Sequence, residues 1–142
     1  MEKMNQNLKE YNFYGELEYE GEYLNGKRNG KVKEYNNNED IIFEGEYLNG
    51  EKNGKGKEYK SKFCQIELIF EGEYLNGKKW NGKGKEYDVG VLIFEGEYLN
   101  GKRNGEGKAY YDGVLIFQGE YINGERLSGT EYNFRGYFVF SG

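Results

Sequence analysis

The sequence predicts an all-β fold, a single elongated and twisted antiparallel sheet built from tandem β-hairpins. Three observations predict it. A short phrase of aromatic, glycine and charged residues repeats along the 142-residue chain, which has 23 glycines and no proline. Aromatic residues make up 18% of the chain, whereas all hydrophobic residues together reach only 36%. Because each flat ring buries a large area, this composition suits a thin sheet with one apolar layer better than a thick aliphatic core.

The repeat is defined by an aromatic residue followed by any residue and then Gly-Glu-Tyr. Its five copies are spaced by 24, 27, 24 and 23 residues and start at Tyr19, Phe43, Phe70, Phe94 and Phe117. Periods in this range are typical of stacked repeat arrays. Residues 1–18 are interpreted as a half repeat, and residues 133–142 as a C-terminal half repeat or cap. The whole of 1–142 is therefore expected to be one repeat domain.

The first part of each repeat has the alternation of a β-strand. In residues 41–48, Phe43 and Tyr47 fall on one face, and Glu44 and Glu46 on the other. A glycine within a strand often marks a place where something large comes close. We therefore expect the rings of one hairpin to lie over the glycine backbone of its neighbour.

The second part of each repeat supplies the turn and the returning strand. Residues 49–54 contain two Asn-Gly pairs, which tolerate positive φ and predict a turn. Residues 55–59 then run back, so that Lys55 and Lys57 oppose the glutamates, each pair contributing roughly 0.2–1 kcal/mol. Strict alternation places Tyr59 on the lysine side unless a bulge reverses it, and both arrangements stay open.

The composition argues against several classes of function. The absence of histidine removes Ser-His and Cys-His nucleophiles and the common histidine metal sites. The single cysteine, Cys64, cannot form an internal disulfide and is expected to be a satisfied thiol. The Glu-Gly-Glu pair recurs in successive repeats, which favours a solvated ladder over one catalytic carboxylate pair. We expect no catalytic activity, no cofactor and no bound metal.

Charge and hydropathy predict the partners and the location. The net charge of −5, without a block of basic residues, lacks the basic excess of a nucleic-acid-binding protein. No apolar leader and no run of membrane-spanning length is present. A cytoplasmic protein is expected, with peripheral association with a membrane or the cytoskeleton left open.

The repeat resembles the MORN (membrane occupation and recognition nexus) repeat, with its signature aromatic-x-Gly-x-aromatic-x-x-Gly-x-x-His-Gly-x-Gly. Residues 43–56 read Phe-Glu-Gly-Glu-Tyr-Leu-Asn-Gly-Glu-Lys-Asn-Gly-Lys-Gly. Val32 replaces the last glycine of the first full copy, and Trp80 is a one-residue insertion. Asparagine stands where histidine is commonest, at Asn29, Asn53, Asn81 and Asn104. The resemblance implies a groove-bearing β-sheet with a scaffold role, since the catalytic domains found beside some MORN arrays are absent from this sequence.

The aromatic stripe is the candidate partner-binding groove. Its residues recur once per repeat and are Tyr23, Tyr47, Tyr74, Tyr98, Tyr121, Phe43, Phe70, Phe94 and Phe117. The alternative is that these rings are simply the core, and this is favoured for the phenylalanines. Tyrosine is apolar along its body and polar at its tip, which is typical of binding surfaces.

Three functions follow from such a groove. The first is binding of a protein partner, as a peptide or helix laid along the stripe. The second is phospholipid binding through a basic edge made of Lys27, Arg28, Lys78, Lys79, Lys102 and Arg103, although the net charge speaks against broad attraction to anionic membranes. The third is an architectural spacer or self-assembly module, with a homodimer formed through a terminal repeat because half repeats leave unpaired strand edges.

Overall fold

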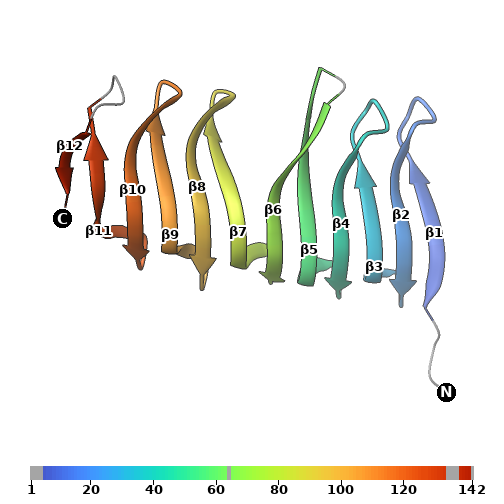
Figure 1. Cartoon of the computed structure of the whole chain (residues 1–142). Helices are drawn as coiled ribbons and strands as arrows, with labels where there is room; N and C mark the ends of the chain where they lie inside the picture. The colour runs from blue at the N-terminus through green and yellow to red at the C-terminus, as the bar shows by residue number, and fades with distance from the viewer. Residues whose placement is uncertain (1–4, 64, 134–137, 142) are drawn as a thin grey trace. The chain divides into compact units, whose positions relative to one another are not determined.

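The computed structural model describes residues 5–63, 65–133 and 138–141, and for 138–141 the backbone only. The chain divides into two compact units, Met1–Lys79 and Trp80–Gly142. The described residues form twelve strands and no helix, and within each unit every strand pairs antiparallel with its neighbours in chain order (Figure 1). The predicted fold class, an all-β antiparallel sheet of tandem hairpins, is confirmed.

The strand bounds follow the repeats. The first unit contains β1 (Gln6–Tyr11), β2 (Leu17–Leu24), β3 (Lys27–Tyr35), β4 (Ile41–Leu48), β5 (Glu51–Lys62) and β6 (Gln65–Leu75). From the boundary onward come β7 (Lys78–Asp88), β8 (Val91–Leu99), β9 (Lys102–Tyr111), β10 (Val114–Ile122), β11 (Glu125–Tyr132) and β12 (Phe138–Ser141). Each predicted repeat start falls within an even-numbered strand from β2 to β10.

The turn between β4 and β5 is shorter than predicted. Asn49 and Gly50 have φ of 49° and 88°, and β5 begins at the next residue. Two consecutive positive φ values fit the tight two-residue turn that matches strand twist. The expectation of a turn over the whole of 49–54 is therefore wrong, because the first Asn-Gly pair is sufficient to reverse the chain.

The second Asn-Gly pair forms a bulge inside β5. Gly54 has φ of 94°, and the register between β4 and β5 shifts between Gly45 and Tyr47. The Glu46 carboxylate accepts the Lys55 backbone N–H at 2.9 Å, and a Cβ on Gly54 would lie 2.3 Å from Glu46 Oε2. Glu46 therefore stabilises the bulge, which corrects the expected pairing of its side chain with that of Lys55.

Consecutive hairpins are joined at their turns through the asparagine that replaces the histidine of the signature. Asn29 Oδ1 accepts the Asn49 N–H at 3.0 Å, and the Gly50 N–H donates to the Arg28 carbonyl at 2.8 Å. In the second unit Asn104 accepts the Asn123 N–H at 3.2 Å. Asn29 and Asn104 thus each join one hairpin turn to the next.

The core is the layer of rings on one side of the sheet. Phe43 lies in edge-to-face contact with Tyr47 of its own repeat and with Tyr74 of the next, with ring centroids 6.0 and 5.4 Å apart. A Cβ on Gly56 would lie 2.9 Å from ring atoms of both Phe43 and Tyr74. The prediction that rings lie over neighbouring glycine backbone is confirmed.

Some predictions fall outside the described part of the chain. These are Cys64, residues 134–137 and 142 of the expected cap at 133–142, and the first four residues of the half repeat at 1–18. The single-domain interpretation stays a prediction, alongside the division into two compact units.

Candidate binding groove

The predicted aromatic stripe is a packed layer. Its four phenylalanines are 0–3% exposed, and Tyr47, Tyr74 and Tyr121 are 4–8% exposed. Tyr23 and Tyr98 are half-buried. The side of the sheet that carries these rings is called the ring face. The predicted role of the rings in binding a partner stays a prediction.

Three tyrosine hydroxyls in this layer have carboxylate partners within the protein. Tyr47 donates its hydroxyl hydrogen to the Glu34 carboxylate, Tyr74 donates to Glu58 at 3.1 Å, and Tyr98 donates to Glu86 at 2.5 Å. Burial first, and then the neighbouring carboxylate, raise the pKa of all three tyrosines. These hydroxyls are therefore part of the structure of the layer.

The predicted basic edge divides into two kinds of residue. The second member of each pair lies over a ring: Arg28 Cζ is 4.0 Å from the Tyr19 centroid, Lys79 Nζ 5.3 Å from Phe70, and Arg103 Cζ 4.1 Å from Phe94. The first members, Lys27, Lys78 and Lys102, are exposed at the turns. Each of these hairpins thus presents one exposed lysine at its turn, while the other cation covers the core.

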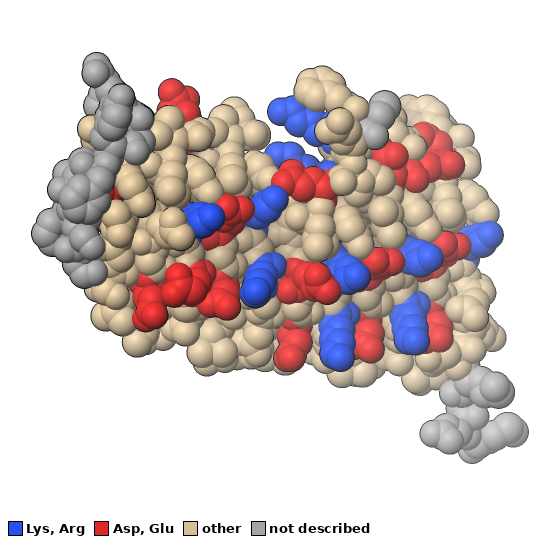
Figure 2. All heavy atoms as spheres, in the orientation of Figure 1, with Lys and Arg blue, Asp and Glu red and all other residues tan. Residues whose placement is uncertain are grey.

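The opposite side, called the ladder face, carries two lines of charge that cross the strands of the first unit. In the first line each residue pairs directly with the next across neighbouring strands: Lys9, Glu20, Lys33, Glu44, Lys57 and Glu71. The second line contains Glu22, Lys31, Glu46, Lys55 and Glu73. Basic and acidic side chains alternate in lines on the side of the molecule shown in Figure 2. The predicted opposition of Glu44 and Lys57 is confirmed.

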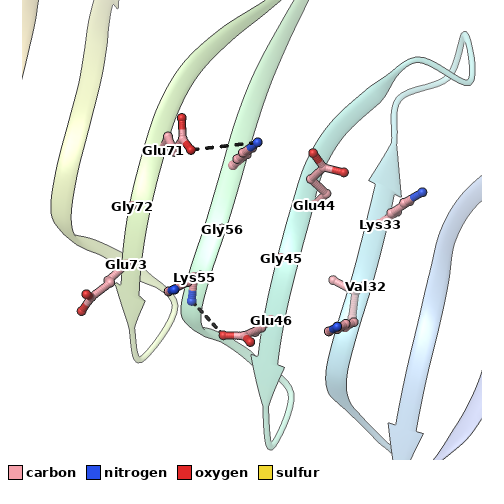
Figure 3. A pocket seen from close by; sticks show the side chains of 12 residues that line it. Val32, Lys33, Glu44, Gly45, Glu46, Lys55, Gly56, Glu71, Gly72 and Glu73 are labelled. Carbon is pink, nitrogen blue, oxygen red and sulfur yellow. Dashed lines mark hydrogen bonds and ion pairs between the residues drawn. The ribbon is translucent and has the colours of Figure 1, made fainter.

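Between these two lines lies a groove whose floor is largely glycine. It has a volume of about 590 Å³, and its floor is formed by Val32, Gly45, Gly56 and Gly72 (Figure 3). A neighbouring hollow of about 310 Å³ shares Val32 and continues over Gly21 toward β1. The floor on this face is backbone because a Cβ on Gly45 or Gly56 would point to the ring face, toward Phe43. The walls on either side are Glu and Lys side chains.

A second set of tyrosines holds the acidic members of the first line. Tyr59 donates to Glu44 at 2.7 Å, and Tyr35 donates to Glu20 at 2.6 Å. Burial, followed by the hydrogen bond to glutamate, raises the pKa of each tyrosine to about 12. The open question about Tyr59 is thereby answered: it lies on the ladder face, as strict alternation requires. These hydrogen bonds hold the carboxylates of Glu20 and Glu44 in the first line of charges.

The ladder face of the second unit does not keep the alternation. Glu95 pairs with Lys85 and Lys108 as in the first unit, but Glu106 lies directly opposite Glu120. Like charges in this arrangement are destabilising. The regular charge pattern is therefore a property of the first unit.

Within residues 5–63, 65–133 and 138–141, no group of three or more His, Cys, Asp or Glu side chains is placed to hold a metal ion. The same part of the chain contains no helix long and apolar enough to cross a membrane. What the arrangement provides is a shallow channel with a backbone floor and charged walls.

Tandem hairpins with rings packed over glycines define a β-repeat protein. A family model of the MORN repeat matches residues 19–31, 43–64 and 94–113. The chain therefore contains MORN repeats in these three segments. MORN repeats are generally modules that bind proteins or membranes, and the repeat itself is of a non-enzymatic type. No curated protein matches the chain.

Sequence reasoning did not identify the groove on the ladder face, because it considered only the rings as a binding surface, a prediction that stays open. The signal was present in the spacing, since Gly45, Gly56 and Gly72 come into register once the hairpins are paired. It also overlooked the alanine at position 109. Ala109 stands in Lys-Ala-Tyr where three earlier repeats have Lys-Glu-Tyr. That departure is visible without a structure.

Proposed function

We propose that this chain is a non-enzymatic MORN-repeat scaffold that binds an extended segment of a partner protein in the glycine-floored groove of its first unit. The observation that carries this proposal is the groove itself, an open channel across β3 to β6 with regularly spaced charges on both walls. Its volume lies within the range of ordinary ligand sites, about 300–1,000 Å³.

The period of the charges favours one backbone conformation for the partner. Both lines place lysines on β3 and β5 and glutamates on β4 and β6. Neighbouring strands lie about 4.8 Å apart, so like charges recur about every 9.6 Å. A polyproline II segment rises about 3.1 Å per residue with three residues per turn, which returns every third side chain to the same side after about 9.3 Å.

The agreement of these two periods predicts the sequence of the ligand. An acidic residue at every third position would meet lysines on alternate strands, such as Lys33 and Lys57, which are both exposed. The acidic residues of the ligand would lie away from Glu46, because like charges repel. The Glu46 carboxylate already accepts a backbone N–H within the protein. The channel from β1 to β6 spans five strand spacings and therefore holds about eight residues in this conformation.

The test uses a fluorescent peptide of Glu-Pro-Pro repeats about nine residues long, with a Lys-Pro-Pro peptide as the opposite-charge control. Anisotropy is measured on the natural chain, on the double variant Lys33→Gln with Lys57→Gln, and on the matched control Lys27→Gln with Lys78→Gln. Both double variants remove two exposed lysines of the first unit. We expect the groove variant to bind the acidic peptide at least tenfold more weakly, about 1.4 kcal/mol, and the control variant to bind it normally.

Two results would contradict the proposal. Absence of binding by the natural chain would remove the groove as a site for such a segment. Equal weakening in both double variants would show general charge attraction without a site. Phosphoinositide vesicles form the second arm: loss of vesicle binding in the Lys27 and Lys78 variant alone would favour the phospholipid alternative.

The predicted docking of a peptide or helix on the ring face is a different version of the same function. A partner there would first meet the cations and carboxylates that cover the rings, such as Arg28 and Glu34, which lie 3.5 Å apart. The self-assembly alternative is tested by the solution mass of the chain, since a dimer would have twice the 16.6 kDa of the monomer.

A further inference from the structure

The rings of each unit are covered by a row in which cations and carboxylates alternate. In the first unit Arg28 pairs with Glu10 at 2.8 Å and with Glu34 at 3.5 Å. Glu58 lies 3.8 Å from Lys52 and 3.1 Å from Lys79. Arg28 therefore lies between two glutamates, and Glu58 lies between two lysines, so that the charges of the row alternate.

In the second unit one carboxylate of this row is missing. Glu58 lies opposite Phe43 on one side and Phe70 on the other. Ala109 occupies the corresponding register position, opposite Phe94 and Phe117. The two arginines that adjoin this position keep one ion pair each, Arg103 with Glu86 at 2.9 Å and Arg126 with Glu131 at 3.7 Å.

A buried hydroxyl marks the same position. Tyr74, which lies opposite Gly54, donates to Glu58, and Tyr121 lies opposite Gly105 in the same register. The side chain of Tyr121 is 4% exposed, and its hydroxyl is the buried side-chain polar atom without a hydrogen-bond partner in the described part of the chain. Buried polar groups in native proteins are nearly always paired, so this one requires an explanation.

We propose that the position above Ala109 binds a carboxylate that a ligand supplies, accepting the Tyr121 hydroxyl and pairing with Arg103 and Arg126. The chemistry of the ligand is set by the other repeats, where the same register position is filled by the carboxylates of Glu34, Glu58 and Glu86. Arg103 and Arg126 have side chains that are 30% and 42% exposed, so both guanidinium groups are accessible to a ligand from solvent.

This site belongs to the ring face of the second unit and does not depend on the groove proposed above. It accounts for three observations together: the alanine in place of glutamate, the unpaired hydroxyl and the two arginines. A structural role alone would be better served by glutamate at position 109.

The test measures the denaturant midpoint of the full chain in sodium acetate and in sodium chloride at equal sodium concentration. A ligand that binds only the folded state raises the midpoint as its concentration passes the dissociation constant. We expect acetate to raise the midpoint of the natural chain. In Ala109→Glu we expect a higher midpoint without acetate and loss of the response, because the side chain fills the position.

A matched variant transfers the site to the first unit. Glu58→Ala leaves Tyr74 in the situation of Tyr121, so its lowered midpoint should be partly restored by acetate and not by chloride. A response to acetate that is unchanged in Ala109→Glu would overturn the proposal, as would the absence of any response in the natural chain. Proton-carbon spectra of labelled tyrosine give a direct readout, with the Tyr121 ring signals expected to move.

Two further arms separate the sources of the carboxylate. A capped Gly-Glu-Gly peptide that acts at lower concentration than acetate indicates an acidic side chain of a partner protein, whereas equal potency indicates a small carboxylic acid. Inorganic phosphate is the control for general anion binding, and a response to phosphate as strong as that to acetate would contradict a carboxylate site.

Discussion

Replacing Tyr74 and Tyr121 by phenylalanine should have opposite effects on stability. Both residues hold the same place in their repeats, and both are 4% exposed. Tyr74 donates to Glu58 at 3.1 Å, whereas the Tyr121 hydroxyl is buried without a partner among the described residues. Each substitution removes one oxygen and leaves the ring contacts in place.

The magnitudes follow from the surroundings of each hydroxyl. A hydrogen bond to a charged group contributes about 1.5–3 kcal/mol net. Glu58 keeps its ion pair with Lys79 at 3.1 Å and is 25% exposed, so the lower end applies and Tyr74→Phe should cost about 1.5 kcal/mol. Removing the unpaired hydroxyl of Tyr121 should relieve a desolvation penalty of about 1–3 kcal/mol.

The assay is equilibrium unfolding in urea, combined with amide hydrogen exchange at Gly56 and Gly107. The exchange measurement is needed because the chain has two compact units, and repeat arrays do not always unfold in one step. We expect Tyr74→Phe to lower the protection of Gly56, and Tyr121→Phe to maintain or raise that of Gly107. Equal destabilisation by the two substitutions would refute the assignment of an unpaired hydroxyl to Tyr121.

Three other perturbations test the packing, the turns and the pH dependence. Gly56→Ala should destabilise by about 1–3 kcal/mol through overpacking, measured by urea unfolding, because the new Cβ would lie 2.9 Å from the Phe43 ring. Asn29→Ala should cost about 1 kcal/mol and speed amide exchange at Asn49, whose N–H it accepts. Folding raises the pKa of four tyrosines from 10 to about 12. Their contribution to the free energy of unfolding should therefore be fully present below pH 10 and decrease as the pH rises from 10 to 12. The titration is measured by the absorbance of tyrosinate. The residues concerned are Tyr19, Tyr35, Tyr59 and Tyr110; ionisation of these four residues near pH 10 without loss of structure would contradict this.

The arrangement of strands was predictable because local signals agree. Alternation fixes the faces of Phe43 and Glu44, and Asn49-Gly50 fixes the turn. The register then brings Gly45 opposite Gly56. Each of these steps depends on neighbouring residues only, so one copy of the repeat contains the information.

The details that failed depend on contacts between strands. Two Asn-Gly pairs look alike in sequence, and only the Glu46 carboxylate shows that the pair at Gly54 is a bulge. The assignment of the binding surface to the rings stays a prediction, and it was made because a tyrosine hydroxyl needs a partner. The structure supplies that partner as Glu34 for Tyr47. The amino-acid composition does not show whether a tyrosine hydroxyl bonds to a side chain of the same protein or to a ligand.

The central claim is that a partner segment lies on the ladder face of the first unit. It is tested most directly by intermolecular nuclear Overhauser contacts between the Glu-Pro-Pro peptide and the labelled chain. The account predicts contacts from proline protons to the Hα protons of Gly45, Gly56 and Gly72, which form the floor of the groove. Contacts to the ring protons of Phe43 or Tyr47 instead would place the partner on the ring face and contradict it.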